Sequence, residues 1–276
     1  MRRVLRLLAI YTSYAAIIVI IMFPIYTQFL ASVIPRVDLW SRPLSFIPWS
    51  FTIKNYIEIL SPTHEIPIRA ALFNSAVVAS GTTIVCLCLG SLAAYGFARL
   101  RFSRKQLVLS SFLAVYMLPA MLFLIPLFII MRELHLLDTY ASLIIPYSVW
   151  MLPFVTVILK AFFESVPGDI EDAALTDGCS RIQTIWRVIL PLSAPGLVAA
   201  AIYTFIGAWN EFLTPLVLTS RLVMITTALG LYTTTYQVEV GHLAAAGFLA
   251  TVPVIVLTIV FQKYIVKGIM EGSVKG

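Results

Sequence analysis

The chain has 276 residues, of which 60% are apolar and 12% are charged, whereas a soluble globular protein has roughly 45–50% apolar and about 25% charged residues. This composition excludes an ordinary water-soluble domain. Six membrane spans of about 20 residues each would occupy roughly 120 residues, so we expect one transmembrane domain over residues 1–276. The net charge of +6 comes from 19 basic and 13 acidic residues. In a membrane protein such a balance reflects topology rather than binding to nucleic acid.

Apolar stretches without period-two alternation predict transmembrane helices along the whole chain. In order, they cover about 7–33, 70–98, 108–131, 139–162, 196–218 and 241–261. Each is long enough to cross an apolar layer of about 30 Å as a helix, and only helices and closed barrels satisfy the backbone there. The long unbroken runs exclude a barrel, so the fold class is all-α with six spans.

The basic residues predict the orientation of these spans. If the N-terminus lies in the cytoplasm, 13 of the 19 Lys and Arg residues fall on the cytoplasmic side. The positive-inside rule therefore places both termini in the cytoplasm. The largest external loop, 34–69, contains five prolines and predicts an irregular cap rather than a domain.

The sequence shows no motif of a catalytic or metal-binding site. The three histidines, His64, His135 and His242, fall in or beside predicted external loops, and no His-Glu-x-x-His motif occurs. The chain contains no Gly-Lys dipeptide, so the phosphate-binding loop of ATPases is absent. We therefore expect no catalytic residue, no metal and no cofactor bound by this chain.

The predicted cytoplasmic loop 163–191 carries the clearest local pattern. Asp169 can cap a helix over 170–177, which Gly178 can end in the left-handed conformation. A helix of two turns is unstable alone in water, and this one offers a small apolar patch for docking. The patch comprises Ala173, Ala174 and Leu175. A capped surface loop without a partner is the alternative interpretation.

A second helix is predicted immediately after the first. Ser180 can cap it, and one apolar face recurs at i, i+3, i+4 and i+7. The residues of this face are Ile182, Ile185, Trp186 and Ile189. Such a helix would lie along the membrane surface and brace the first.

This loop resembles the signature of ABC-importer permeases, Glu-Ala-Ala-x3-Gly-x9-Ile-x-Leu-Pro. The corresponding residues are Asp172, Ala173, Ala174, Gly178, Val188, Ile189, Leu190 and Pro191. The resemblance implies a type I ABC-importer permease fold and a coupling role toward an ATP-binding subunit for Glu171, Asp172, Ala173, Ala174, Gly178, Leu190 and Pro191. Asp172 stands where the family has Glu, and whether it or Glu171 has the role of that acid stays open.

Two further segments are similar to the smaller permease subunit of maltose-type importers. The first is the tail, which the resemblance places between the ATP-binding subunits through Lys267, Gly268, Val274, Lys275 and Gly276; a frayed end is the alternative. The second is Trp209-Asn210-Glu211-Phe212, in which Asn210 and Glu211 are candidates for the translocation path. A structural hydrogen bond, or a position near the outer interface, is the alternative for this pair.

The resemblance implies a permease subunit of an ATP-driven importer that translocates a sugar delivered by an external binding protein. Its partners would be a second homologous permease, a dimer of ATP-binding subunits that hold ATP and Mg, and the lipid bilayer of a bacterial or archaeal plasma membrane. The chain itself would be no enzyme. An ion-coupled secondary transporter and an intramembrane hydrolase are the rival functions, and the sequence does not identify the sugar.

Overall fold

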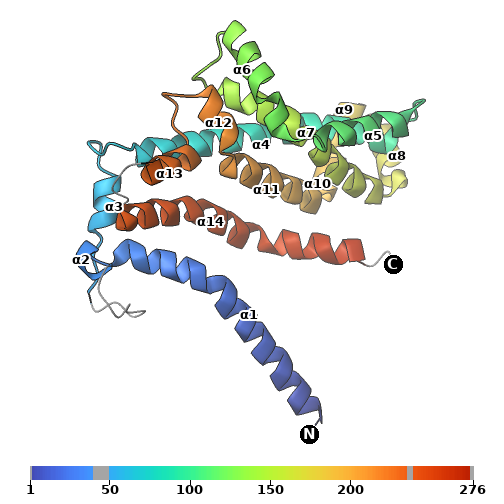
Figure 1. The fold of residues 1–276 in the computed structure, drawn as a ribbon. Coiled ribbons are helices and arrows are strands. Elements are labelled where there is room, and N and C mark those ends of the chain that lie inside the picture. The colour runs from blue at the N-terminus through green and yellow to red at the C-terminus, as the bar shows by residue number, and fades with distance from the viewer. Residues whose placement is uncertain (1, 40–49, 235–238, 274–276) are drawn as a thin grey trace. The chain divides into compact units, whose positions relative to one another are not determined.

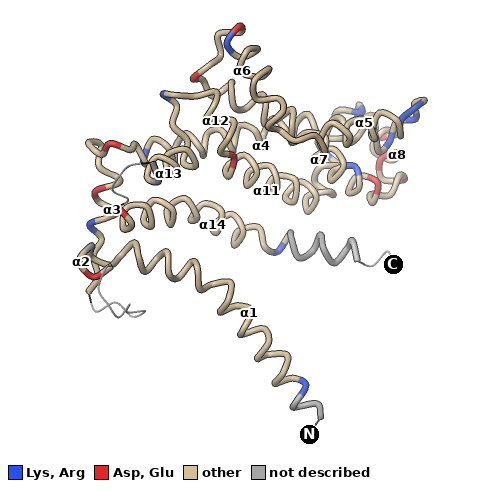
Figure 2. The backbone as a smooth tube through the Cα atoms, viewed as in Figure 1, with Lys and Arg blue, Asp and Glu red and all other residues tan. Residues whose placement is uncertain are grey.

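The computed structural model describes residues 2–39, 50–234 and 239–273, and every regular element in these ranges is a helix (Figure 1). Four helices of this described part are long and apolar enough to cross a membrane, or up to six if each of two sharply bent pairs is one span. The four long helices are α1 (Arg2–Val33), α4 (Ile68–Arg99), α7 (Ala141–Ser165) and α14 (Val240–Ser273). Figure 2 shows that charged residues gather near the helix ends and connections. The predicted all-α class is confirmed.

The chain falls into two compact units, and the first comprises Met1–Ala70 and Ala228–Pro253. It contains α1, the short helices α2 (Arg36–Leu39) and α3 (Lys54–Ile59), and the start of α14. Near the C-terminal end of α1, the ring of Phe29 lies 5.1 Å from that of Phe248 on α14. No residue in the most apolar window of α1 is buried.

The second unit comprises Ala71–Thr227 and Val254–Gly276, and within it α7 packs against α4, α5 and α11. Val155, Leu159 and Phe163 of α7 are completely buried. Gly90 of α4 lies so close to α7 that an added Cβ would be 2.8 Å from Cγ1 of Val155. The absence of a side chain at Gly90 therefore allows α4 and α7 to approach each other closely.

Two helix pairs of this unit are sharply bent at residues that suit a break. Helix α5 (Lys105–Tyr116) is followed by the 3₁₀ turn η1 (Ala120–Phe123) and α6 (Leu124–Glu133), with a bend of 86°. Pro119 lies in this break with an extended backbone, where it removes a donor and restricts the residue before it.

The second bend lies between the segment Arg181–Leu192 and α11 (Ala194–Asn210), and it measures 85°. The bent segment consists of α9 (Arg181–Thr184), the π turn η2 (Ile185–Ile189) and α10 (Leu190–Leu192). Pro195 stands in the first turn of α11, where its missing N–H leaves no bond unmade.

The prediction of one continuous helix over 196–218 is wrong. Helix α11 ends at Asn210, Glu211 has extended backbone, and a separate helix α12 covers Leu213–Leu218. The carboxylate of Glu211 accepts a hydrogen bond from the backbone N–H of Thr214, at 2.8 Å, and thereby supports the new helix start. A further helix, α13 (Ile225–Thr234), was not predicted.

Candidate coupling site and cavity

Helix α8 (Gly168–Thr176) is the predicted docking helix, and its C-terminus has a defined end. Gly178 has a φ of +88°. The N–H of Gly178 donates to the carbonyl of Leu175, and that of Cys179 donates to Ala174. These two bonds form a Schellman motif, which needs the left-handed residue at the position of Gly178. The predicted role of Gly178 in ending the helix is therefore confirmed.

The predicted N-cap of α8 is wrong. Pro167 occupies the cap position without a side-chain bond, and Asp169 lies inside the first turn together with Glu171. Gly168 already has helical backbone, so the helix begins earlier than the acid suggested. Acidic side chains in a first turn still interact favourably with the positive end of the helix dipole.

Glu171 and Asp172 differ completely in their surroundings. Glu171 is 7% exposed, and its Oε1 accepts a hydrogen bond of 2.5 Å from the hydroxyl of Tyr95. Its Oε2 lies 2.8 Å from Nε of Arg99, and Nη2 of Arg99 donates to the carbonyl of Val166 at 2.6 Å. Glu171 therefore fastens α8 to the end of α4.

The opposite side of α8 is open. Asp172 and Ala173 are exposed, whereas Ala174 and Leu175 are half-buried. A partner that contacted the helix would therefore meet Asp172 and Ala173 rather than Glu171. Of the three residues of the predicted apolar patch, only Ala173 is exposed.

The segment after α8 begins as predicted and then departs from the prediction. The Ser180 hydroxyl accepts from the N–H of Gln183, and the Gln183 side chain accepts from the N–H of Ser180, which is a capping box. The predicted helix is interrupted by the π turn η2, and its apolar residues differ in burial within the chain. Ile185 and Ile189 are buried, whereas Ile182 is 64% and Trp186 is 52% exposed.

The other predicted coupling residues are placed as follows. Leu190 is buried and Pro191 is exposed, both in α10. Lys267 and Gly268 lie in the backbone of α14. Val274, Lys275 and Gly276 lie outside the described residues. The coupling role of the tail stays a prediction.

A cavity of about 140 Å³ lies in the second unit, bounded by η1, α6, α7, α11 and α12. Its lining includes Phe123, Pro146, Tyr147, Trp150, Glu211 and Thr214. Of the predicted pair Asn210 and Glu211, only Glu211 lines the cavity, and Asn210 is exposed at the end of α11. Sequence reasoning missed Tyr147 and Trp150, which stand three residues apart and so share one face of α7.

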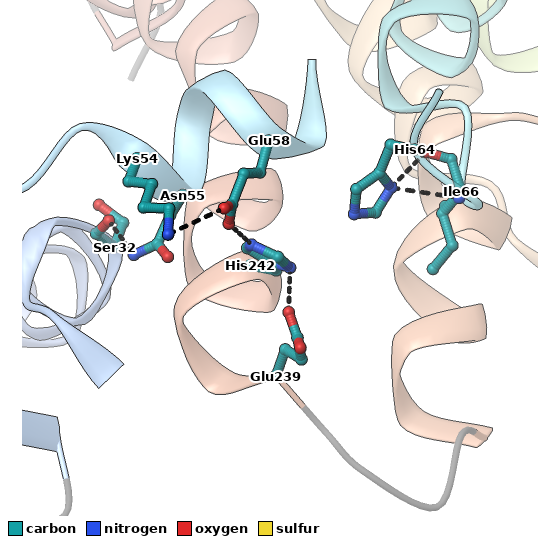
Figure 3. A network of polar contacts seen from close by, with 8 residues as sticks. All are labelled: Ser32, Lys54, Asn55, Glu58, His64, Ile66, Glu239 and His242. Atoms are coloured by element: carbon teal, nitrogen blue, oxygen red, sulfur yellow. Dashed lines mark hydrogen bonds and ion pairs between the residues drawn. The ribbon is translucent and has the colours of Figure 1, made fainter. Parts of the chain in front are cut away.

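Polar contacts of the first unit join α3 to α14 (Figure 3). Nε2 of His242 lies 2.8 Å from a carboxylate oxygen of Glu58, and its Nδ1 contacts Glu239. The bond with His242 is the main cause that lowers the pKa of Glu58. In the described ranges no three His, Cys, Asp or Glu side chains are grouped to hold a metal ion.

Residues 87–271 match the sequence pattern of the family described as binding-protein-dependent transport system inner membrane component. The chain belongs to this family. It is 38% identical to the sulfoquinovosyl glycerol transport system permease protein of Agrobacterium fabrum, with 92% of this chain and 89% of that protein covered. It is 41% identical to the trehalose transport system permease protein of Mycobacterium tuberculosis, over 83% and 84% of the two chains.

A solved structure shows the same fold. The similar chain comes from a bacterial ABC transporter involved in the import of the acidic polysaccharide alginate, with a TM-score of 0.80 and 21% identity over 94% of this chain and 97% of that one. The fold is thus that of an ABC-importer permease. The protein is a multi-pass inner membrane permease subunit of an ABC importer, and it is not an enzyme.

Proposed function

We propose that this permease translocates a carbohydrate, and that α8 is the element through which ATP hydrolysis on a partner subunit drives the change between outward and inward access. The relatives described above carry names that specify sulfoquinovosyl glycerol and trehalose transport, which supports the sugar class. The partners in this proposal are a second permease, a dimer of ATP-binding subunits with ATP and Mg, and an external binding protein. Both termini lie in the cytoplasm.

The coupling role is supported by the different surroundings of the two sides of α8. One side is fastened to α4 through the buried contacts of Glu171 with Tyr95 and Arg99. The other side presents Asp172 and Ala173 to solvent. A helix held in this way moves together with α4, so a partner that pushes on its open side moves the span.

The sharpest test uses the end of this helix. Gly178→Asp adds a Cβ at φ +88°, where a non-glycine residue costs roughly 1–2 kcal/mol. No atom lies within 4 Å of an ideal Cβ there, so the substitution strains the cap without disturbing internal packing. We expect lost uptake and lost co-purification of the ATP-binding subunit, with normal membrane abundance.

Two further variants complete the experiment. Ala173→Asp places a charge on the open patch and should act like Gly178→Asp. Arg181→Ala changes an exposed residue outside the patch and should be nearly neutral. Normal transport and normal ATPase binding by Gly178→Asp would show that α8 is not the coupling element.

A further inference from the structure

The cavity beside Glu211 combines three features that structural packing alone leaves unexplained. The Tyr147 side chain is 4% exposed, and its hydroxyl has no hydrogen-bond partner in the described part of the chain. Buried polar atoms in native proteins nearly always have a partner, so an unpaired one indicates a missing water, ion or ligand. Tyr147 lines the cavity.

The two carboxylate oxygens of Glu211 differ in their hydrogen bonds. Oε1 accepts from both the backbone N–H and the hydroxyl of Thr214, at 2.8 and 2.7 Å. These bonds account for the structural role of Glu211 at the start of α12. Oε2 takes no part in them, and an ionised carboxylate oxygen at a largely apolar site favours a hydrogen-bond donor.

The remaining lining is apolar and aromatic. Trp150 is half-buried, and its ring lies 6.0 Å from that of Phe123. A few polar groups on an apolar and aromatic surface are the usual composition of a small-molecule site. A sugar ring matches it, because its C–H faces pack on aromatic rings while its hydroxyls donate to a carboxylate and pair with a phenol.

The size and charge of the cavity limit the size and the charge of the ligand. An apolar cavity of about 150 Å³ binds a molecule the size of benzene, and the volume here is about 140 Å³, so the cavity has room for no more than one ring. No Lys or Arg is among the residues that line it in the described structure, and Glu211 is its single charged group. A ring that carries a carboxylate or sulfonate would face this charge without a compensating cation.

We propose that this cavity is a subsite for one uncharged sugar ring, in which Glu211 accepts ring hydroxyls, Tyr147 pairs with another hydroxyl and Trp150 packs against the ring. The proposal deepens the carbohydrate function proposed above and rests on it. It assigns to this permease its own contact with the substrate and a preference for neutral over anionic sugars.

The test measures how well a sugar protects a cysteine in the cavity from modification. The external binding protein is left out, because its own specificity would otherwise decide which sugars give protection. In the complete transporter lacking native cysteines, Leu127→Cys places a thiol on the lining and Ile125→Cys places one on the same helix outside it, at a residue 75% exposed. The rate of thiol modification is measured with methyl α-D-glucopyranoside, with D-glucuronate, and with neither.

The neutral glucoside should slow modification of Leu127→Cys, while glucuronate should not and Ile125→Cys should respond to neither. Glu211→Gln keeps an oxygen for Thr214 but removes the charge, and Tyr147→Phe keeps the ring but removes the hydroxyl. Each should raise the glucoside concentration that gives half protection, by about tenfold for Glu211→Gln, as expected when a hydrogen bond to a charged group is weakened. The matched controls lie outside the lining: Glu133→Gln at the exposed end of α6, and Tyr140→Phe at the N-cap of α7.

Three results would overturn the subsite. They are absence of protection by the glucoside, equal protection by glucuronate, and unchanged half protection in both Glu211→Gln and Tyr147→Phe. If any of them occurs while Gly178→Asp still abolishes sugar uptake, the proposed transport function stands and only the subsite fails. Protection of Leu127→Cys together with absence of sugar uptake by the wild-type transporter would instead refute the transport function.

Discussion

At the scale of single residues, two adjacent acids in α8 have opposite environments. The family signature places Asp172 at the position of its acid and leaves open whether Glu171 has that role, whereas the structure buries Glu171 against Tyr95 and Arg99. The sequence could place both acids on one short helix. It could not show which one faces inward, because that depends on partners more than seventy residues earlier in the chain.

Removing the inward acid should destabilise the protein. Glu171→Ala leaves the guanidinium of Arg99, whose side chain is 18% exposed, without its carboxylate, and breaking a buried pair in this way costs about 3 kcal/mol or more. Thermal denaturation of the purified transporter should show a lowered midpoint. Asp172→Ala should leave the midpoint unchanged, and Glu171→Ala with Arg99→Leu should recover part of the loss. Equal midpoints for the two single variants would contradict the assigned roles.

A second acid, Asp138, holds the loop between α12 and α13. Asp138 accepts hydrogen bonds from the N–H groups of Ser220 and Arg221, at 2.5 and 2.7 Å, and from the Ser220 hydroxyl at 2.9 Å. The backbone bonds are the main cause that lowers the pKa of Asp138 to about 2. Because the pKa is lowered in the folded state, this contribution to stability is present above the ordinary pKa of 3.8 and is lost as the pH falls toward 2.

Asp138→Asn should release this loop at neutral pH. Asp138 has a φ of +59°, which Asn tolerates well, so the substitution removes the charge while keeping the backbone. Hydrogen–deuterium exchange of residues 220–222 should become faster in the variant. In the wild type, exchange corrected for its intrinsic pH dependence should be the same at pH 5 and pH 7. A difference there would show that Asp138 titrates in that range.

At the scale of helices, the sequence predicted the long apolar elements well and their interruptions poorly. Hydropathy over 196–218 is continuous, yet α11 stops at Asn210 because Glu211 supports a new helix start at α12. The Pro119 bend had a visible cause in the sequence, but proline alone does not give an angle of 86°. Pro146 and Pro153 lie inside the continuous helix α7, so tertiary packing decides which proline breaks a span.

The contact between α4 and α7 should be sensitive to one methyl group. Gly90→Ala brings a Cβ to 2.8 Å from Val155, which is completely buried and has a stiff side chain. Overpacking of this kind costs about 1–3 kcal/mol. In the same helix Gly96→Ala meets no atom within 4 Å and should be neutral or stabilising by up to about 1 kcal/mol. Thermal midpoints that fall equally in both variants would refute the close approach.

At the scale of the whole molecule, the charge asymmetry predicts which loops face outward. In a chain whose native cysteines are replaced by alanine, single cysteines at the exposed residues Thr63 and Ser103 should report opposite sides. An impermeant thiol reagent should label Thr63→Cys in intact cells and Ser103→Cys only after lysis. Labelling of Ser103→Cys in intact cells would invert the proposed topology.

The exposure of α1 within the chain should affect how fast its sequence evolves. None of the most apolar window of α1 is buried within the chain, whereas half of the corresponding window of α7 is. Contacts within this chain therefore constrain both the shape and the polarity of α7, whereas they leave the shape of most of α1 unconstrained. The family pattern begins at residue 87 and does not include α1. We expect substitutions among Leu, Ile, Val and Phe to accumulate fastest in this first helix. Related permeases should therefore lose sequence similarity in α1 first, while the helix itself stays in the membrane.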